Sequence, residues 1–228
     1  MRCIGVDLGW TLGASGLALL EYDGAVLRYL ESTRILEIDA VLEWIADRSE
    51  GDCVVAVDAP LRLGNPAGMR EAEKQAHRLY GRFDAGCYPS NRGSTFAART
   101  TGFAAALENL GLPHVCPPNR CQFECFPHIT AVEVFGLDRI FKYKKGPRAQ
   151  RASELSRMRQ TMLDKLPITG LDRLPSIPTK GNLKYVEDEL DAVLCAYMAF
   201  HWGRWGLERN QILGEIDEGC IIIPRVRA

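Results

Sequence analysis

The sequence predicts an α/β fold in which a mixed sheet is flanked by helices. Strand-like apolar runs follow one another at residues 2–9, 14–24 and 26–35, and an Asp-Gly pair between the last two is typical of a hairpin turn. An amphipathic helix is expected at 39–48, and a nearly continuous apolar strand follows at 52–61. Because a helix crosses over between strands, the last strand is expected to pair in parallel. An antiparallel three-strand meander plus parallel strands therefore describes the sheet.

The remainder of the chain is predicted as further helices with short strands, all within a single domain spanning 1–228. Residues 64–120 are expected to form a helical and loop insertion within that domain. The loop "CYPSNRGST" inside it resembles a phosphate-binding loop only in composition. The other expected elements are helices at 69–81, 103–111, 128–136, 151–166 and 186–202, a strand at 121–127, and a loop or turn leading into a short strand at 214–224.

Composition sets limits on the class of protein. With 228 residues, ordinary apolar content and a net charge of −1, the chain is long enough for a buried core and has no global attraction for nucleic acid. No apolar run reaches the roughly 20 residues that cross a bilayer, so no membrane insertion is expected. Asp7 interrupts the short apolar start, which is unlike a signal peptide. The eight cysteines are therefore expected to be reduced thiols in a cytoplasmic protein.

Two acidic residues stand at predicted strand ends. Asp7 closes the first strand in "GVDLG", and Asp58 closes the fourth in "VAVDAPL", where Pro60 stops the strand. If these strands lie side by side and parallel, both carboxylates leave the same edge of the sheet, where open α/β sheets bind ligands. Taken alone, each residue could be an ordinary solvated carboxylate at the end of a strand.

A third acidic contribution lies in the helix "EDELDAVLCAYMAF". Asp188 and Asp191 share one helix face, and Glu187 reaches the same side. Small residues further along would let this helix approach the sheet closely. Acids in a first turn can also serve only to complement the helix dipole. Like charges crowded together need a cation or a proton, and carboxylates are the ligands that Mg²⁺ or Mn²⁺ prefers, so a two-metal site for phosphodiester hydrolysis is predicted.

These three motifs resemble the acidic motifs of the RNase H-like superfamily, in the order seen in RuvC-type resolvases. The closer resemblance is to a family of uncharacterised bacterial and archaeal domains described as predicted nucleases of RNase H fold. "FECFPHITAVEVFG", "KYKKG" and "GEIDEGCIIIP" are similar to later motifs of that family. The resemblance implies that Asp7 bridges two Mg²⁺ or Mn²⁺ ions, Asp58 holds one, Asp188 with Asp191 completes the site, and Glu124 joins them.

Basic residues are candidates for contacts with nucleic acid, of a type that the sequence does not specify. The run "FKYKKGPRAQR" carries Lys142, Lys144 and Lys145, which could clamp phosphates or simply form a solvated loop. Arg70 and Arg78 of the helix at 69–81 could face a phosphate or water. A homodimer would suit a substrate with two-fold symmetry.

Other readings of the sequence stay open. "DLGWT" resembles the first phosphate loop of actin-like ATPases and sugar kinases, which would make the protein a nucleotide-binding phosphotransfer enzyme, although such chains pair two domains. A non-catalytic nucleic-acid-binding module is the other alternative. The stretch "HVCPPNRCQFECFPH" offers Cys and His ligands for zinc on paper, but strand alternation favours Cys121 and Cys125 as buried thiols.

Overall fold

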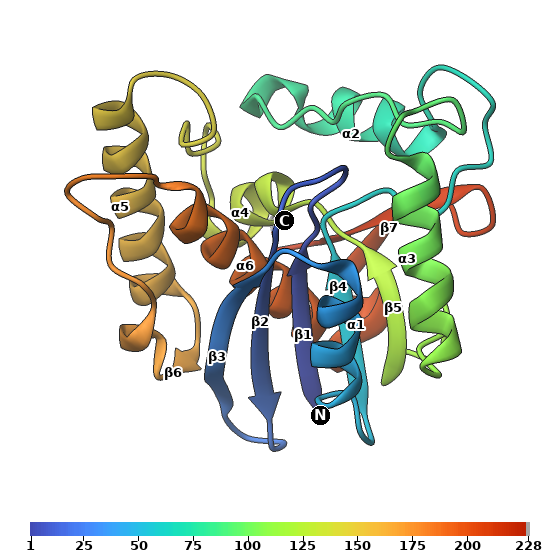
Figure 1. Cartoon of the computed structure of the whole chain (residues 1–228), viewed down its shortest axis with the longest axis horizontal. Helices are drawn as coiled ribbons and strands as arrows, with labels where there is room; N and C mark the ends of the chain where they lie inside the picture. The colour runs from blue at the N-terminus through green and yellow to red at the C-terminus, as the bar shows by residue number, and fades with distance from the viewer. Residues whose placement is uncertain (227–228) are drawn as a thin grey trace.

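The computed structural model describes residues 1–226, and its centre is a six-stranded mixed sheet (Figure 1). The strand order is β5-β4-β1-β2-β3-β6. A separate two-stranded hairpin is formed by the last two strands. The strands are β1 (Arg2–Asp7), β2 (Ser15–Tyr22), β3 (Leu27–Ile35), β4 (Cys53–Val57), β5 (Arg120–Glu124), β6 (Ile168–Thr169), β7 (Asn210–Glu215) and β8 (Gly219–Pro224).

Strand directions confirm the predicted fold class, a mixed α/β sheet with an antiparallel three-strand meander plus parallel strands. β1 pairs antiparallel with β2, and β2 pairs antiparallel with β3, which gives the meander. β4 pairs in parallel with β1, and β5 pairs in parallel with β4. The two-residue strand β6, which the sequence analysis did not predict, extends the other edge in parallel with β3.

Helices cover both faces of this sheet, so alternate residues of its central strands enter two different cores. The long helix α6 passes behind the sheet in Figure 1, whereas α1 lies in front of it. On the α6 side Phe123 of the sheet packs with Trp202, and on the other side Ile4 belongs to a core with Trp44 and Leu107. Burial on both faces explains why these strands read as continuous apolar runs. The α-helices are α1 (Ile38–Ala46), α2 (Glu71–Tyr80), α3 (Ala97–Asn109), α4 (Pro127–Phe135), α5 (Arg148–Lys165) and α6 (Lys184–Trp205), with short 3-10 turns at Gly81–Phe83, Leu171–Arg173 and Gly206–Glu208.

Two glycines let α6 lie directly on the meander. A Cβ at Gly5 would stand 1.9 Å from the carbonyl oxygen of Ala192, and one at Gly16 would stand 2.0 Å from the carbonyl oxygen of Asp188. Real Cβ atoms do not approach oxygen that closely, so any larger residue would push the helix away. The close approach holds the acidic start of α6 against the strands that carry the sheet-edge carboxylates.

The C-terminal region differs from the sequence expectation. The turn and the short strand expected at 214–224 are present, the strand being β8, but the preceding strand β7, which pairs antiparallel with it, was not predicted. This hairpin packs its apolar side chains against α2 and α4, including Leu213 and Ile221. Within residues 64–120, α3 contributes Leu107 to the main sheet core. That this segment is an insertion into the domain stays a prediction.

Candidate active site

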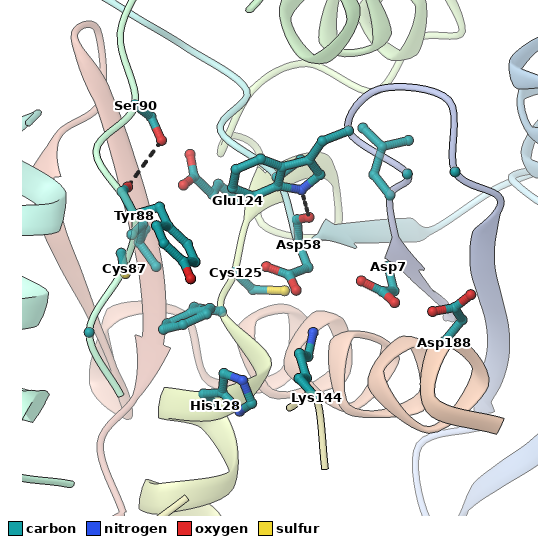
Figure 2. A pocket seen from close by; sticks show the side chains of 18 of the residues that line it. Asp7, Asp58, Cys87, Tyr88, Ser90, Glu124, Cys125, His128, Lys144 and Asp188 are labelled. Atoms are coloured by element: carbon teal, nitrogen blue, oxygen red, sulfur yellow. Dashed lines mark hydrogen bonds between the residues drawn. The ribbon is translucent and has the colours of Figure 1, made fainter. Parts of the chain in front are cut away.

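The two strand-end carboxylates meet at one edge of the sheet. Val6 and Val57 are partners in the parallel pairing of β1 with β4, and the amide of Asp58 donates to the Val6 carbonyl at 2.8 Å. Asp7 and Asp58 therefore emerge next to each other, and both line a cavity of about 640 Å³ (Figure 2). The indole of Trp10 donates to the Asp58 carbonyl at 2.9 Å and fixes the backbone there. The geometry inferred from the strand ends is thus present.

Helix α6 brings the other two predicted aspartates to the same end of the sheet, but at different depths. Asp188 lines the cavity beside Asp7 (Figure 2), whereas Asp191 is fully buried and is not part of the cavity wall. Glu187 turns towards α5 instead, where Arg151 contacts it at 3.2 Å. The helix therefore presents one aspartate to the cavity and keeps another one behind it.

Both aspartates of α6 are paired with basic side chains. Asp188 receives the Arg34 guanidinium at 2.6 Å, and the Lys184 ammonium lies 2.7 Å from its other oxygen. The Lys144 ammonium lies 3.0 Å from Asp191. None of these three basic partners was expected from the sequence. Arg34 lies opposite Gly16 in the sheet, 154 residues from its partner, so local sequence carried no signal of the pair.

Asp7 and Asp58 have no such partners. Among residues 1–226, neither carboxylate accepts a hydrogen bond or forms an ion pair, although both side chains are at least nine-tenths buried. Burial, together with repulsion from Asp191 and from other nearby carboxylates, raises the pKa of Asp58 to about 7 and raises the pKa of Asp7 well above its usual range. Lys144 partly opposes both shifts. The pair is therefore a site that favours a bound proton or cation.

Lys144 projects its ammonium into the centre of this group of carboxylates (Figure 2). Burial alone would disfavour the charged amine, but Asp191 and the neighbouring acids hold the pKa of Lys144 well above its usual value. The phenol of Tyr143 donates to Asp191 at 2.5 Å from the same segment of chain. Nearby, burial and the positive charge of Lys144 lower the pKa of His128 to about 3, so its imidazole is neutral at physiological pH. The cavity thus contains a permanent cation and a neutral ring.

Glu124 follows a different pattern from the one expected of a metal ligand. Its two oxygens accept from the Arg70 guanidinium at 2.8 and 2.7 Å, and the same guanidinium contacts Glu73. All three side chains are buried. Arg70 is therefore already engaged by two carboxylates, in an arrangement that joins α2 to the end of β5. Burial raises the pKa of Glu124, with Arg70 opposing the shift.

The remaining predicted basic residues fall into two groups. Lys142 and Lys145 line the cavity, Lys142 lying 2.8 Å from Asp84 and Lys145 donating to the Tyr88 hydroxyl at 2.9 Å. Arg78 is exposed on α2 and does not line the cavity. Of the Lys and Arg side chains that line the cavity, Lys142, Lys144 and Lys145 thus come from the loop between α4 and α5, whereas Arg70 precedes α2 and Lys184 begins α6.

The cavity offers oxygen donors without a preformed metal-binding cluster among the described residues. Within residues 1–226, no three His, Cys, Asp or Glu side chains converge as a preformed metal site. The donors in the cavity are hard oxygens, the chemistry that Mg²⁺ and Mn²⁺ require. Asp188 Oδ1 is buried and lies 2.7 Å from the Lys184 ammonium, so it could bind an ion only if that lysine moved away. The residues therefore fit a divalent cation in donor type and charge, with Asp188 exchanging a lysine for the ion.

The Cys/His stretch forms no cluster of its own. Cys121 and Cys125 are buried in the core on the α6 side together with Phe123, as strand alternation predicts. Cys116 is exposed, and all eight cysteines are free thiols. Of the cysteines and histidines of this stretch, Cys125 and His128 line the cavity. The reading of these cysteines as thiols rather than zinc ligands agrees with this arrangement.

The fold and cavity define the chain as an α/β protein with a carboxylate-lined site at one sheet edge. The chain belongs to the family described as "Protein of unknown function (DUF429)", which it matches over residues 5–213. Among solved structures it is similar to T. thermophilus RuvC in complex with Holliday junction substrate, at 12% identity and a TM-score of 0.39, covering 89% of this chain and 93% of that chain. Among curated proteins, nothing matches it. Within the described residues, no helix has both the length and the apolar character to cross a membrane.

Proposed function

We propose that the protein is a metal-dependent phosphodiester hydrolase that acts on nucleic acid. The observation that carries this proposal is the pair of neighbouring carboxylates, Asp7 and Asp58, which are buried, face a cavity and lack any protein partner among residues 1–226. Two unpaired buried charges of the same sign destabilise a fold unless a cation or a proton neutralises them. Their oxygen donors and their place at the sheet edge favour a divalent cation.

Asp7 and Asp58 would hold Mg²⁺ or Mn²⁺, and Asp188 would complete the set of ligands. The ion would supply Lewis-acid stabilisation of charge on a phosphoryl group and would lower the pKa of a bound water. Asp191 stays behind the cavity wall, where it positions Lys144. Glu124, locked to Arg70, supports the site through β5 and α2 rather than as a ligand.

The chain's own basic groups suit a phosphate-containing substrate. Lys142, Lys144 and Lys145 leave one short segment and reach the same cavity, so they can contact successive phosphates of a strand. His128 presents a neutral ring that can accept a hydrogen bond from water or from a leaving group. The three lysines place positive charge beside the carboxylates, where the phosphate of a phosphodiester would lie.

Hydrolysis of bis(p-nitrophenyl) phosphate and of a panel of single-stranded, duplex and branched DNA and RNA tests the proposal. We expect activity that requires Mn²⁺ or Mg²⁺ and falls by about 100-fold or more in Asp7→Asn and Asp58→Asn. Asp39→Asn, at an exposed carboxylate of α1, is the matched control and should retain full activity. Equal hydrolysis by all three variants, or binding of nucleic acid without any metal-dependent hydrolysis, would overturn the assignment.

A further inference from the structure

The cavity extends well beyond the carboxylates, and its far end has a different chemistry. Figure 2 shows Asp7 and Asp188 at one end, Tyr88 with Cys87 and Ser90 at the other, and His128 and Lys144 along the floor between them. The far end is built by the loop after α2, by β8 and by the segments on either side of α4. Its apolar and aromatic lining consists of Cys87, Tyr88, Phe126, His128, Ile140, Phe141 and Ile221.

Tyr88 is the feature of this end that the fold does not explain. Its ring is 67% exposed, so it contributes little to the core. Lys145 donates to its hydroxyl at 2.9 Å and also lies near the ring face, 5.7 Å from the centroid. An exposed tyrosine that is tethered beside a cavity is typical of a binding surface rather than of packing.

Aromatic rings continue from this tyrosine into the cavity. His128 packs edge-on against Phe126 at 5.4 Å between centroids, and on its other side against Tyr143 at 5.6 Å. These contacts hold the neutral imidazole in one orientation. A flat apolar ligand would therefore meet preformed ring faces and edges rather than mobile side chains.

From this arrangement we propose that the far end binds one unpaired nucleobase of the strand whose phosphodiester lies at the carboxylates. This inference rests on the proposed function and names its substrate class, a single-stranded or flipped-out nucleotide. Stacking on an aromatic ring suits every base, because every base has a π face. A base that stays paired and stacked in a duplex cannot enter a cavity that is enclosed by side chains.

Charge complementarity supports this occupant over other flat molecules. Lys144 lies along the floor between the aromatic end and the acidic end (Figure 2), where the sugar and phosphate of a bound nucleotide would pass, and Lys142 and Lys145 also line the cavity. The cavity volume of about 640 Å³ is within the range that holds small organic ligands. A neutral aromatic molecule would make no use of the positive charge of the lysines, and an acidic peptide would offer no ring for Tyr88.

Binding of oligonucleotides that contain 2-aminopurine tests this inference separately from hydrolysis. Affinity and fluorescence are measured in EDTA and again with Ca²⁺, using a single strand, a strand with one unpaired 2-aminopurine in a duplex, and a fully paired duplex. We expect quenching by stacking for the first two probes and weaker binding of the paired duplex. Tyr88→Ala should weaken binding of the single strand by about 10-fold or more and abolish the quenching, whereas Tyr88→Phe should retain both.

Tyr185→Ala provides the matched control, since Tyr185 is another exposed tyrosine and does not line the cavity. It should bind all three probes like the wild-type protein. Unchanged affinity and quenching in Tyr88→Ala, equal affinity for the paired duplex, or no binding of any probe would overturn the inference. Base binding without hydrolysis would refute only the proposed activity, and hydrolysis that is indifferent to Tyr88 would refute only the base pocket.

Discussion

Replacing Asp58 with asparagine should change how stability depends on pH. Its pKa in the folded protein is about 7, compared with a usual value of 3.8, because the carboxylate is buried among other acids. The folded state therefore holds this proton more tightly than the unfolded state. The resulting stability is fully present below pH 3.8 and is lost as the pH rises through about 7.

The magnitude follows from the size of the shift. A difference of about three pKa units corresponds to about 4 kcal/mol over the whole titration, and about 2.5 kcal/mol of it falls between about pH 5 and pH 8. Asparagine carries no charge at either pH and cannot lose this stability. The unfolding free energy of Asp58→Asn relative to wild type should therefore rise by about 2.5 kcal/mol between those two pH values. Loss of repulsion on Asp7 adds to the change in the same direction.

Urea unfolding, followed by circular dichroism in EDTA at each pH, measures this difference directly. Comparison across pH cancels any constant effect of placing an amide in the cavity. Asp39→Asn, at an exposed site, should track the wild type at both values. A relative stability of Asp58→Asn that stays constant with pH, or that falls as pH rises, would refute the view that Asp58 is a buried and unneutralised carboxylate.

Three further predictions concern the groups around the site. Lys144→Met should destabilise the metal-free protein by about 2 kcal/mol, because it leaves the buried carboxylate of Asp191 without its cation. In a melting assay, this variant should gain more thermal stability from Mn²⁺ than the wild type does. An equal gain would contradict the view that the Lys144 ammonium takes the place of a metal ion among the carboxylates. Arg70→Met should lower the unfolding free energy by about 3 to 5 kcal/mol, since the buried Glu73 and Glu124 lose their partner. In the same urea titration, Arg78→Ala, at an exposed site, should change the unfolding free energy by no more than about 0.5 kcal/mol. Similar small losses in both variants would show that the Arg70 ion pairs do not support the structure. Gly5→Ala should prevent stable folding, because its Cβ would overlap the backbone of α6. Gly102→Ala, in α3 with open space around it, should instead stabilise the protein by about 0.5 to 1 kcal/mol in thermal melts. A Gly5→Ala protein with wild-type stability would rule out the close contact of helix and sheet.

Strand ends were the part of the site that sequence could locate. The runs that end in Asp7 and Asp58 are apolar on both faces, which predicts central parallel strands, and parallel neighbours release their last residues at the same edge. The small residues of α6 likewise signalled its close approach to the sheet. These inferences rest on local patterns, so they needed no knowledge of distant contacts.

The distant charge partners could not be found in this way, although Lys184, four residues before Asp188 on the same helix, could have been. Lys144 lies 47 residues before the aspartate that it neutralises, and Arg34 lies in β3, where it was read only as part of a strand. Whether a carboxylate faces an ion pair or an open cavity depends on the path of loops, which periodicity does not describe. Strand β7 was missed for a related reason, because the polar residues of the acidic turn between β7 and β8 resemble a longer loop.

Tyr88 illustrates what a sequence can signal without resolving. It lies in the Gly/Ser/Pro-containing loop "CYPSNRGST", where no helix or strand periodicity accounts for an aromatic residue. The sequence analysis weighed this loop only as a weak resemblance to a phosphate loop. Its exposure and its contact with Lys145 become visible only when the loops after α2 and α4 are placed side by side.

The most direct test of the central claim is anomalous diffraction from crystals of the protein soaked in Mn²⁺. We expect an anomalous peak within ligand distance of the carboxylates of Asp7 and Asp58, with Asp188 turned towards the metal and Lys184 displaced. The same soak of Asp58→Asn crystals should lose that peak. Wild-type crystals in which these carboxylates remain free of metal at saturating Mn²⁺ would contradict the assignment of a divalent cation site and of the hydrolase that depends on it.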